Sequence, residues 1–228
     1  MSAEQNLSPV RVWDLPTRLF HWALAFCIAG LLISGNVGGD AMVFHFRLGY
    51  VVMTLLLFRW SWGLIGGRWS RFGSFLPGPR TLLAYLLNHA STTRVVGHSP
   101  LGGLSVLAML GVLSVQVSTG LLSDDEISFA GPLTAFVSNA AVGLATTYHT
   151  AVGKWLVLGL VLLHIGAIIL HTWRKQRLVL AMLTGDKQLV TSVVPSRDDA
   201  ASRLLALAVL AICAAATYAL VSLPAPAL

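Results

Sequence analysis

Five long apolar stretches, separated by short polar segments, dominate the hydropathy pattern of the chain. The pattern predicts membrane spans over about residues 17–36, 44–66, 98–122, 145–173 and 204–223. Each has the roughly 20 mainly apolar residues that a helix needs to cross a hydrocarbon core of about 30 Å. Two segments outside the spans are predicted as well. Residues 1–10 are expected to be a weakly ordered tail, and the amphipathic stretch 81–89 is expected to lie along the membrane surface.

The composition agrees with a membrane protein. Hydrophobic residues make up 56% of the chain and charged residues only 11%, and the mean hydropathy is +0.76. Soluble domains carry about 25% charged residues. The fold class that we expect is therefore an all-α integral membrane protein.

The distribution of charge predicts how the spans are oriented. Segments 67–97 and 174–203 carry ten Lys and Arg residues, whereas segments 37–43 and 123–144 carry Asp and Glu with no Lys or Arg. Basic loops remain in the cytoplasm, so we expect a multi-pass protein of the bacterial inner membrane with a cytoplasmic N-terminus and a periplasmic C-terminus. The net charge of +6 follows from these flanking residues, and a nucleic-acid partner is not expected.

Several kinds of chemistry are excluded by motif. The two cysteines, Cys27 and Cys213, lie in apolar runs, and the chain has no Cys-x-x-Cys-His motif. Covalent haem attachment and an iron–sulfur cluster held by this chain's thiolates are therefore excluded. The chain also lacks His-Glu-x-x-His, Gly-x-Gly-x-x-Gly and Walker motifs, which argues against a metallohydrolase or a nucleotide-binding protein.

Histidines within the apolar stretches are the main functional candidates, because an ionisable side chain at bilayer depth is costly. The fourth stretch carries His149 and His164, which are 15 residues apart. On a regular α-helix this spacing separates them by about 22 Å along the axis and about 60° around it. Both rings can therefore face one side of the helix, near opposite edges of the membrane.

Two further histidines, His21 and His45, lie near the ends of the first two stretches. The predicted topology places His21 and His164 in the cytoplasmic half, and His45 and His149 in the periplasmic half. Taken singly, His21 and His45 could be boundary residues, but the matched depths favour two bis-histidine haems b. Six-coordinate iron suits electron transfer because no position remains open for a substrate.

His171 is an alternative to His164 as the partner of His21. It lies seven residues beyond His164, on nearly the same helix face and about 10 Å deeper. The separation from His149 to His171 would be roughly 33 Å, more than the hydrocarbon core. We therefore favour His164, and expect His171 near haem propionates or a quinone.

Four other charged or titratable residues are candidates for cofactor binding. Lys154 and Arg47 could each contact a haem propionate at the outer side or extend to the membrane surface. Arg59 could anchor the second span at the interface or lie near the inner haem or a quinone. His98 could begin the third span, contact a propionate or, less favourably, ligate iron.

Polar and small residues inside the spans have a simpler interpretation. Gln116, Ser118 and Thr119 are expected to form hydrogen bonds with neighbouring helices. Glycines such as Gly35 and Gly153 allow helices to pack closely, and they also leave room for a flat macrocycle against the backbone.

Several motifs resemble those of the bacterial cytochrome b561 family, in the branch related to the cytochrome b subunit of nickel–iron hydrogenase. They are VWDLPTRLFHW, HFRLGY, LFRWSWGLIG followed by RFGSF, GHSPLGG, TGLL and LVLAMLTG, together with the pair His149 and His164. The resemblance covers about residues 10–186. It implies a four-helix bundle that holds two b haems through His21, His45, His149 and His164.

The resemblance also implies a domain division and a function. Residues 1–186 would form the di-haem cytochrome b domain, and residues 187–228 a linker and a fifth C-terminal transmembrane helix. The protein would transfer electrons between ubiquinone or menaquinone and a periplasmic c-type cytochrome or dehydrogenase subunit, as an electron-transfer component of an oxidoreductase.

The residues also allow two other functions. A superoxide:ubiquinone oxidoreductase acting at the periplasmic face would use Lys154 and Arg47 to attract the anion, although the acidic loop 123–144 argues against this. A haem-free transporter or assembly factor would be indicated by discontinuous helices or inverted repeats, and the sequence shows neither.

Overall fold

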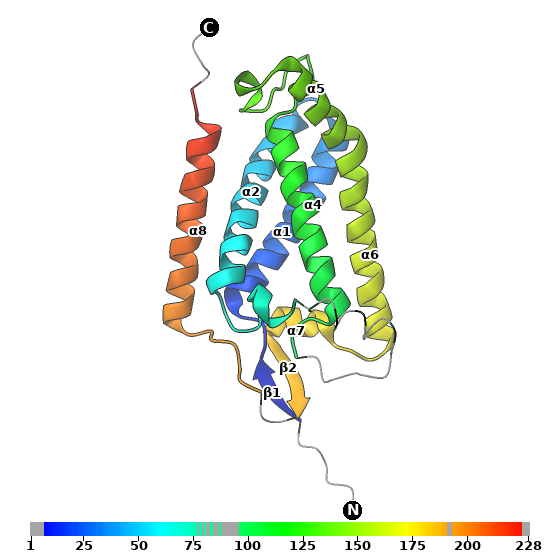
Figure 1. Ribbon diagram of the computed structural model, residues 1–228, viewed down its shortest axis with the longest axis vertical. Helices are drawn as coiled ribbons and strands as arrows, with labels where there is room; N and C mark the ends of the chain where they lie inside the picture. Colours follow the sequence, from blue (N-terminus) through cyan, green and yellow to red (C-terminus); the bar gives the residue numbers. More distant parts are fainter. Residues whose placement is uncertain are drawn as a thin grey trace, which may run out of the picture. The chain divides into compact units, whose positions relative to one another are not determined.

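The computed structural model describes residues 7–76, 78, 80, 83, 87, 96–190 and 193–224 (Figure 1). Apart from Leu83 and Leu87, the predicted surface stretch 81–89 lies outside the described residues, so its prediction stays untested.

The described residues contain five helices that are long and apolar enough to cross a membrane. They are α1 (Leu15–Val37), α2 (Ala41–Ile65), α4 (Pro100–Leu121), a helix over Asn139–Trp173 that ends with α6 (Lys154–Trp173), and α8 (Ala200–Val221). Helix α5 (Asn139–Thr147) and a π-helical turn, η3 (Tyr148–Gly153), lead directly into α6. The five predicted spans are confirmed to within a few residues at most ends, and the protein is an all-α, multi-pass membrane protein.

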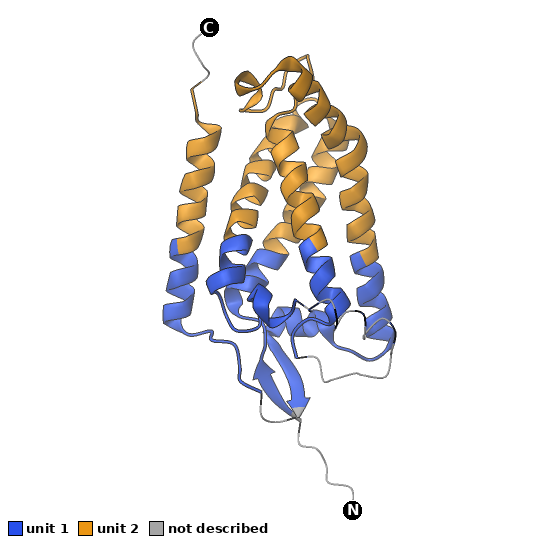
Figure 2. Ribbon diagram, in the orientation of Figure 1, with its two compact units in different colours: residues 1–21, 59–107, 164–208 blue, residues 22–58, 108–163, 209–228 orange. Residues whose placement is uncertain are grey.

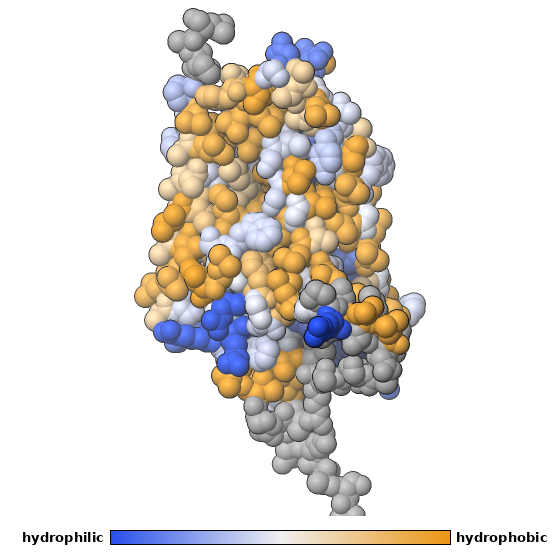
Figure 3. Space-filling view, viewed as in Figure 1, coloured by the Kyte–Doolittle hydropathy of each residue, from blue (hydrophilic) through white to orange (hydrophobic). Residues whose placement is uncertain are grey.

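Apolar side chains predominate over the helices on the face that Figure 3 shows. Phe26 is 75% exposed, Leu64 71% and Leu163 67%. Water would disfavour so many exposed apolar groups, whereas lipid tails accommodate them. The surface is therefore the one expected of a membrane-embedded bundle.

Short elements complete the described chain. They are strands β1 (Leu7–Arg11) and β2 (Asp186–Val190), helix α7 (Leu178–Thr184) and the 3₁₀ turns η1 (Phe72–Ser74) and η2 (Thr134–Phe136). The strands form an antiparallel pair in which Leu7 lies opposite Val190 and Arg11 opposite Asp186.

The prediction of a weakly ordered tail over residues 1–10 is wrong for residues 7–10, because a distant strand pairs with them. The domain division at residue 186 stays a prediction.

The chain forms two compact units, shown in different colours in Figure 2. Unit 1 comprises residues 1–21, 59–107 and 164–208, and unit 2 comprises residues 22–58, 108–163 and 209–228. Each of the five long helices begins in one unit and ends in the other.

In unit 1, Asp14 is fully buried and caps helix α1. Its Oδ1 accepts hydrogen bonds from the backbone N–H of Thr17 (2.8 Å) and from Trp62 Nε1 (3.3 Å), and its Oδ2 accepts one from Ser70 Oγ (2.6 Å). A side-chain acceptor at this position satisfies a backbone donor that the helix leaves unpaired. Neutral donors therefore occupy both oxygens of this buried carboxylate.

The strand pair in unit 1 is held by ionic contacts and by one glycine. Arg11 binds Asp186 at 2.7 Å and also binds Asp198, whose side chain is only 6% exposed. Burial raises the pKa of Asp198, but hydrogen bonds from Arg203, the Leu15 backbone and Arg11 outweigh it and hold the pKa below its usual value. Gly185 ends α7 with φ of 94°, a conformation that a side chain would disfavour.

In unit 2, helices α1, α2 and α8 are in contact. A Cβ atom added at Gly30 would lie 2.7 Å from Cδ1 of Leu48, so the Leu48 side chain of α2 packs directly against the α1 backbone. The hydroxyl of Thr54 on α2 donates to that of Thr217 on α8 at 3.0 Å. The fifth span therefore packs against α2.

Candidate functional site

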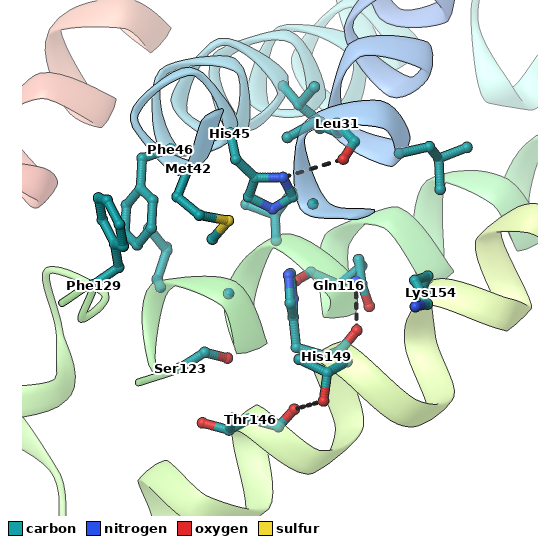
Figure 4. Close-up of a pocket in the computed structure, with 18 of the residues that line it drawn as sticks. Leu31, Met42, His45, Phe46, Gln116, Ser123, Phe129, Thr146, His149 and Lys154 are labelled. Atoms are coloured by element: carbon teal, nitrogen blue, oxygen red, sulfur yellow. Dashed lines mark hydrogen bonds between the residues drawn. The ribbon is translucent and has the colours of Figure 1, made fainter. Parts of the chain in front are cut away.

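A cavity of about 300 Å³ in unit 2 contains His45 from α2 and His149 from the π turn (Figure 4). The ring centroids are 6.1 Å apart, and the rings are nearly perpendicular, at 86°. Most of the lining is apolar, including Ile28, Leu113 and Val157. The volume falls at the lower end of the range of about 300–1,000 Å³ that is typical of ligand and cofactor sites.

A backbone carbonyl orients each of these two rings. His45 Nδ1 lies 3.1 Å from the carbonyl oxygen of Leu31, and His149 Nδ1 lies 2.9 Å from that of Gln116. A carbonyl can only accept, so Nδ1 carries the proton and Nε2 keeps its lone pair. Metal-bound histidines usually have this second contact, because it fixes the tautomer and the ring orientation.

Glycine residues face both rings. A Cβ atom at Gly35 would lie 3.0 Å from Cε1 of His45, and one at Gly120 would lie 2.8 Å from Cε1 of His149. Both distances are shorter than the usual 3.5–4.0 Å contact between carbon atoms. The rings therefore occupy space that any larger residue at these positions would fill.

Gln116 also binds the backbone of His149. The side-chain Nε2 of Gln116 donates to the backbone carbonyl oxygen of His149 at 3.0 Å. The backbone carbonyl oxygen of Gln116 accepts the hydrogen bond from Nδ1–H of His149. A π turn interrupts the regular helical ladder, and such turns often occur at functional sites. The prediction that Gln116 bonds a neighbouring helix is confirmed. The angle of about 60° calculated for His149 and His164 assumed a regular helix, which does not hold through this turn.

The second pair lies in unit 1 and consists of His21 from α1 and His164 from α6. Their ring centroids are 6.2 Å apart, and the rings are inclined by 53°. The ring that the structure brings to His21 is thus the favoured His164. His171 is half-buried at the end of α6, and its Nδ1 has no hydrogen-bond partner among the described residues.

Both pairs have the separation that one iron between two imidazoles requires. With metal–nitrogen bonds of about 2.0 Å, the ligating nitrogens lie about 4 Å apart and the ring centroids about 6 Å apart. Within the described residues, no group of three or more His, Cys, Asp and Glu side chains could hold a metal ion. A pair of imidazoles suits haem, because the porphyrin supplies the other four ligands.

The remaining candidates lie in different environments. Lys154 lines the cavity of His45 and His149, with its Nζ 5.2 Å from the centre of the Trp155 ring. Arg47 is exposed and is not one of the described residues that line this cavity. Arg59 is only 3% exposed and lies over the Phe72 ring, 4.9 Å from its centre.

His98, which precedes α4 in unit 1, is held between two aromatic rings. Its ring centroid is 4.7 Å from that of Trp13 and 4.6 Å from that of Phe75. Burial, together with the nearby Arg59 guanidinium, lowers the pKa of His98 to about 3. Lys187, His164 and His21 act in the same direction, so His98 is neutral and close to the second histidine pair.

Sequence reasoning did not identify the supporting residues Asp14 and Gly120, and for Gln116 it predicted a hydrogen bond to a neighbouring helix without naming His149 as the partner. Asp14 and Gly120 do lie in the VWDLPTRLFHW and TGLL motifs. Their specific contacts depend on residues of other helices, so their roles could not be inferred from the motifs alone.

A multi-pass helical membrane protein with facing imidazole pairs has the features of a membrane-bound b-type cytochrome. Residues 12–185 match the family model described as prokaryotic cytochrome b561. Since this match covers most of the chain, the chain belongs to the prokaryotic cytochrome b561 family. This is a family of membrane-bound b-type cytochromes, which implies haem b as its cofactor.

Similar proteins carry names that refer to a hydrogenase. The "Probable Ni/Fe-hydrogenase 1 B-type cytochrome subunit" of Escherichia coli K12 is 24% identical over 143 residues, which cover 51% of this chain and 61% of the relative. The corresponding "Probable Ni/Fe-hydrogenase B-type cytochrome subunit" of Azotobacter vinelandii is 26% identical, with 68% of this chain and 78% of the relative covered. The Bradyrhizobium diazoefficiens protein of that name is 23% identical, with 78% and 86% covered. No solved structure shows a significant match.

Proposed function

We propose that this protein is a di-haem cytochrome b that transfers electrons between membrane quinone and a redox partner on the periplasmic side. The observation that carries the proposal is the presence of two facing imidazole pairs, with ring centroids 6.1 and 6.2 Å apart. When bound, haem supplies one-electron redox chemistry, and the protein supplies ligands and electrostatics.

In this proposal His45 and His149 ligate an outer haem, and His21 and His164 ligate an inner haem. The backbone carbonyls of Leu31 and Gln116 keep the outer rings in the ligating tautomer. The apolar cavity walls exclude water, and two protein ligands leave no position at the iron for a substrate. The chain's role is therefore to hold and orient redox groups rather than to bind a substrate at the metal.

The orientation that we propose rests on the charges of the connecting segments. Basic residues flank one end of the spans and acidic residues the other, which favours a bacterial inner-membrane protein with a cytoplasmic N-terminus and a periplasmic C-terminus. The outer haem would then face the periplasm. The quinone, ubiquinone or menaquinone, would exchange electrons from within the membrane.

The partner that we propose is a periplasmic c-type cytochrome or the electron-transfer subunit of a dehydrogenase. The names of the relatives refer to nickel–iron hydrogenase, and a hydrogenase belongs to this broader class of partner. Asp124 and Asp125 line the outer cavity, and these carboxylates would favour a partner with a basic surface.

Superoxide oxidation is the second candidate function. Lys154 favours it, because this cation lines the same cavity as His45 and His149. Asp124 and Asp125 oppose it, since they would repel an anion at the same place. Superoxide consumption by the purified protein with added ubiquinone, compared with a Lys154→Gln variant, would distinguish the two functions.

The central test is a pyridine haemochrome assay on the purified full-length chain, together with a reduced-minus-oxidised spectrum. We expect two b-type haems per chain, both reduced by a quinol analogue. A colourless protein would exclude the proposal, and a single haem would exclude one of the two histidine pairs.

A further inference from the structure

Unit 1 contains a buried cation, Arg59, whose guanidinium forms no ion pair with any residue that the structure describes. Arg59 is 3% exposed, and its Nη1 has no hydrogen-bond partner among the residues that the structure describes. A buried charge is costly unless it is paired. The burial of Arg59 therefore indicates that a negatively charged group binds next to it.

One candidate anion among the described residues, Asp14, already accepts hydrogen bonds from other groups. It is close enough to Arg59 to interact electrostatically, but its oxygens accept hydrogen bonds from Thr17, Trp62 and Ser70. These neutral donors satisfy the carboxylate without the guanidinium. The unpaired Nη1 is thus not explained by a contact inside the described chain.

His98 provides a second unpaired donor beside Arg59. Its Nδ1 is buried and has no partner among the described residues, and the rings of Trp13 and Phe75 hold it in place. A neutral imidazole can donate one hydrogen bond to an anion. The two side chains therefore offer a charged donor and a neutral donor from α2 and from the start of α4.

These donors are electrostatically coupled to the second histidine pair. His98 interacts electrostatically with Arg59, and also with His21 and His164. A haem bound between those two histidines would bring two propionate carboxylates into this part of unit 1. Lys187, which donates to the carbonyl oxygens of Val96 and Gly97, would add a further positive charge nearby.

We propose that Arg59 and His98 bind a propionate of the inner haem, with the guanidinium as its counter-ion. This inference rests on the proposed function, because it assumes a haem between His21 and His164. A guanidinium binds a carboxylate through directed, charge-assisted hydrogen bonds, and a lysine in its place would act only as a point charge. A lipid phosphate or a free anion could offer similar oxygens, so the experiment must separate these sources.

The test compares purified wild-type protein with Arg59→Gln, Arg59→Lys and a matched control, Arg71→Gln. Arg71 is an exposed arginine of the same unit. The measurements are the haem count and the midpoint potential of each haem at pH 6, 7 and 8. The inner haem is identified as the one missing from His164→Ala.

We expect Arg59→Gln to lower the equilibrium constant for reduction of the inner haem at least tenfold, which corresponds to 59 mV for one electron. Loss of the cation leaves the propionate charge uncompensated and favours the ferric state. The potential should also become pH-dependent, because the carboxylate can then take up a proton. Arg59→Lys should show a smaller shift, and Arg71→Gln should behave as wild type.

Two outcomes would overturn the inference. One is an equilibrium constant for inner-haem reduction in Arg59→Gln that stays within twofold of the wild-type value, with a midpoint potential that does not vary with pH. This result is expected if Arg59 binds a lipid phosphate or free anion. The other is equal behaviour of Arg59→Lys and Arg59→Gln. Loss of the inner haem from Arg59→Gln, with the inner haem retained in Arg59→Lys and Arg71→Gln, would support the inference. A wild-type protein without haem would instead refute the proposed function.

Discussion

Gly120 offers a sharp test of the outer site, because its missing side chain leaves room for the His149 ring. In Gly120→Ala, the new Cβ would lie 2.8 Å from Cε1 and 3.1 Å from Nδ1 of His149. Carbon atoms in contact prefer about 3.5–4.0 Å, so the ring would have to retreat by about 0.7 Å or more. Metal–ligand bonds tolerate deviations of only about 0.2 Å.

The expected cost follows from these distances. Overpacking a well-packed site costs about 1–3 kcal/mol, which would weaken the affinity for the outer haem by about 5- to 150-fold. The displacement would also disturb the 2.9 Å contact between His149 Nδ1 and the carbonyl oxygen of Gln116. We therefore expect partial or complete loss of the outer haem, with the inner haem retained.

The matched control is Gly111→Ala on the same helix. A Cβ at Gly111 meets no atom within 4 Å, and alanine is favoured over glycine within a helix by about 1 kcal/mol. This variant should keep two haems and the wild-type spectrum. The assay is the pyridine haemochrome count per chain. Two fully retained haems in Gly120→Ala, with an unchanged spectrum, would refute the role assigned to this glycine.

Two further variants test the inner ligand and the strand pair. His164→Ala should remove the inner haem while His171→Ala leaves both, because the structure brings His164 to His21; the reverse haem counts would reassign the ligand. Asp198→Asn should lower the free energy of unfolding by about 1–2 kcal/mol at pH 7, since it weakens the charged hydrogen bonds to Arg11 and Arg203. The folded pKa of Asp198 is below its unfolded value, so this contribution is present above about pH 4 and is lost as the pH falls further. Thermal unfolding in detergent at pH 7 and pH 3.5 measures the difference, and an equal loss at both values would contradict the ionic explanation.

The membrane spans and the two histidine pairs could be predicted from the sequence because they depend on simple, repeated signals. Hydropathy locates the spans, and loop charge assigns a depth to each histidine. Depth matched His45 with His149, whereas His171 stayed an alternative to His164 as the partner of His21, and the length of the fourth span favoured His164. The ring separations agree with that matching, while the role of these histidines as ligands stays a prediction.

The parts that could not be predicted depend on single contacts across the fold. Strand β1 has only five residues and contains Pro9, which is unusual within a sheet except at an edge. The π turn adds a residue to the helical turn around His149 without changing the apolar pattern. The buried environment of Arg59 likewise depends on contacts with Phe72 and Asp14. These contacts form only in the folded protein, so the sequence alone does not show that Arg59 is buried.

The pairing of β1 with β2 has a consequence for how the protein is made. Arg11 and Asp186 are 175 positions apart, so β1 leaves the ribosome long before its partner is synthesised. Helices α1, α2, α4 and α6 must be inserted while this strand still has an unpaired edge. A chain that stops before residue 186 would keep that edge exposed, and it would be a natural substrate for chaperones or membrane proteases.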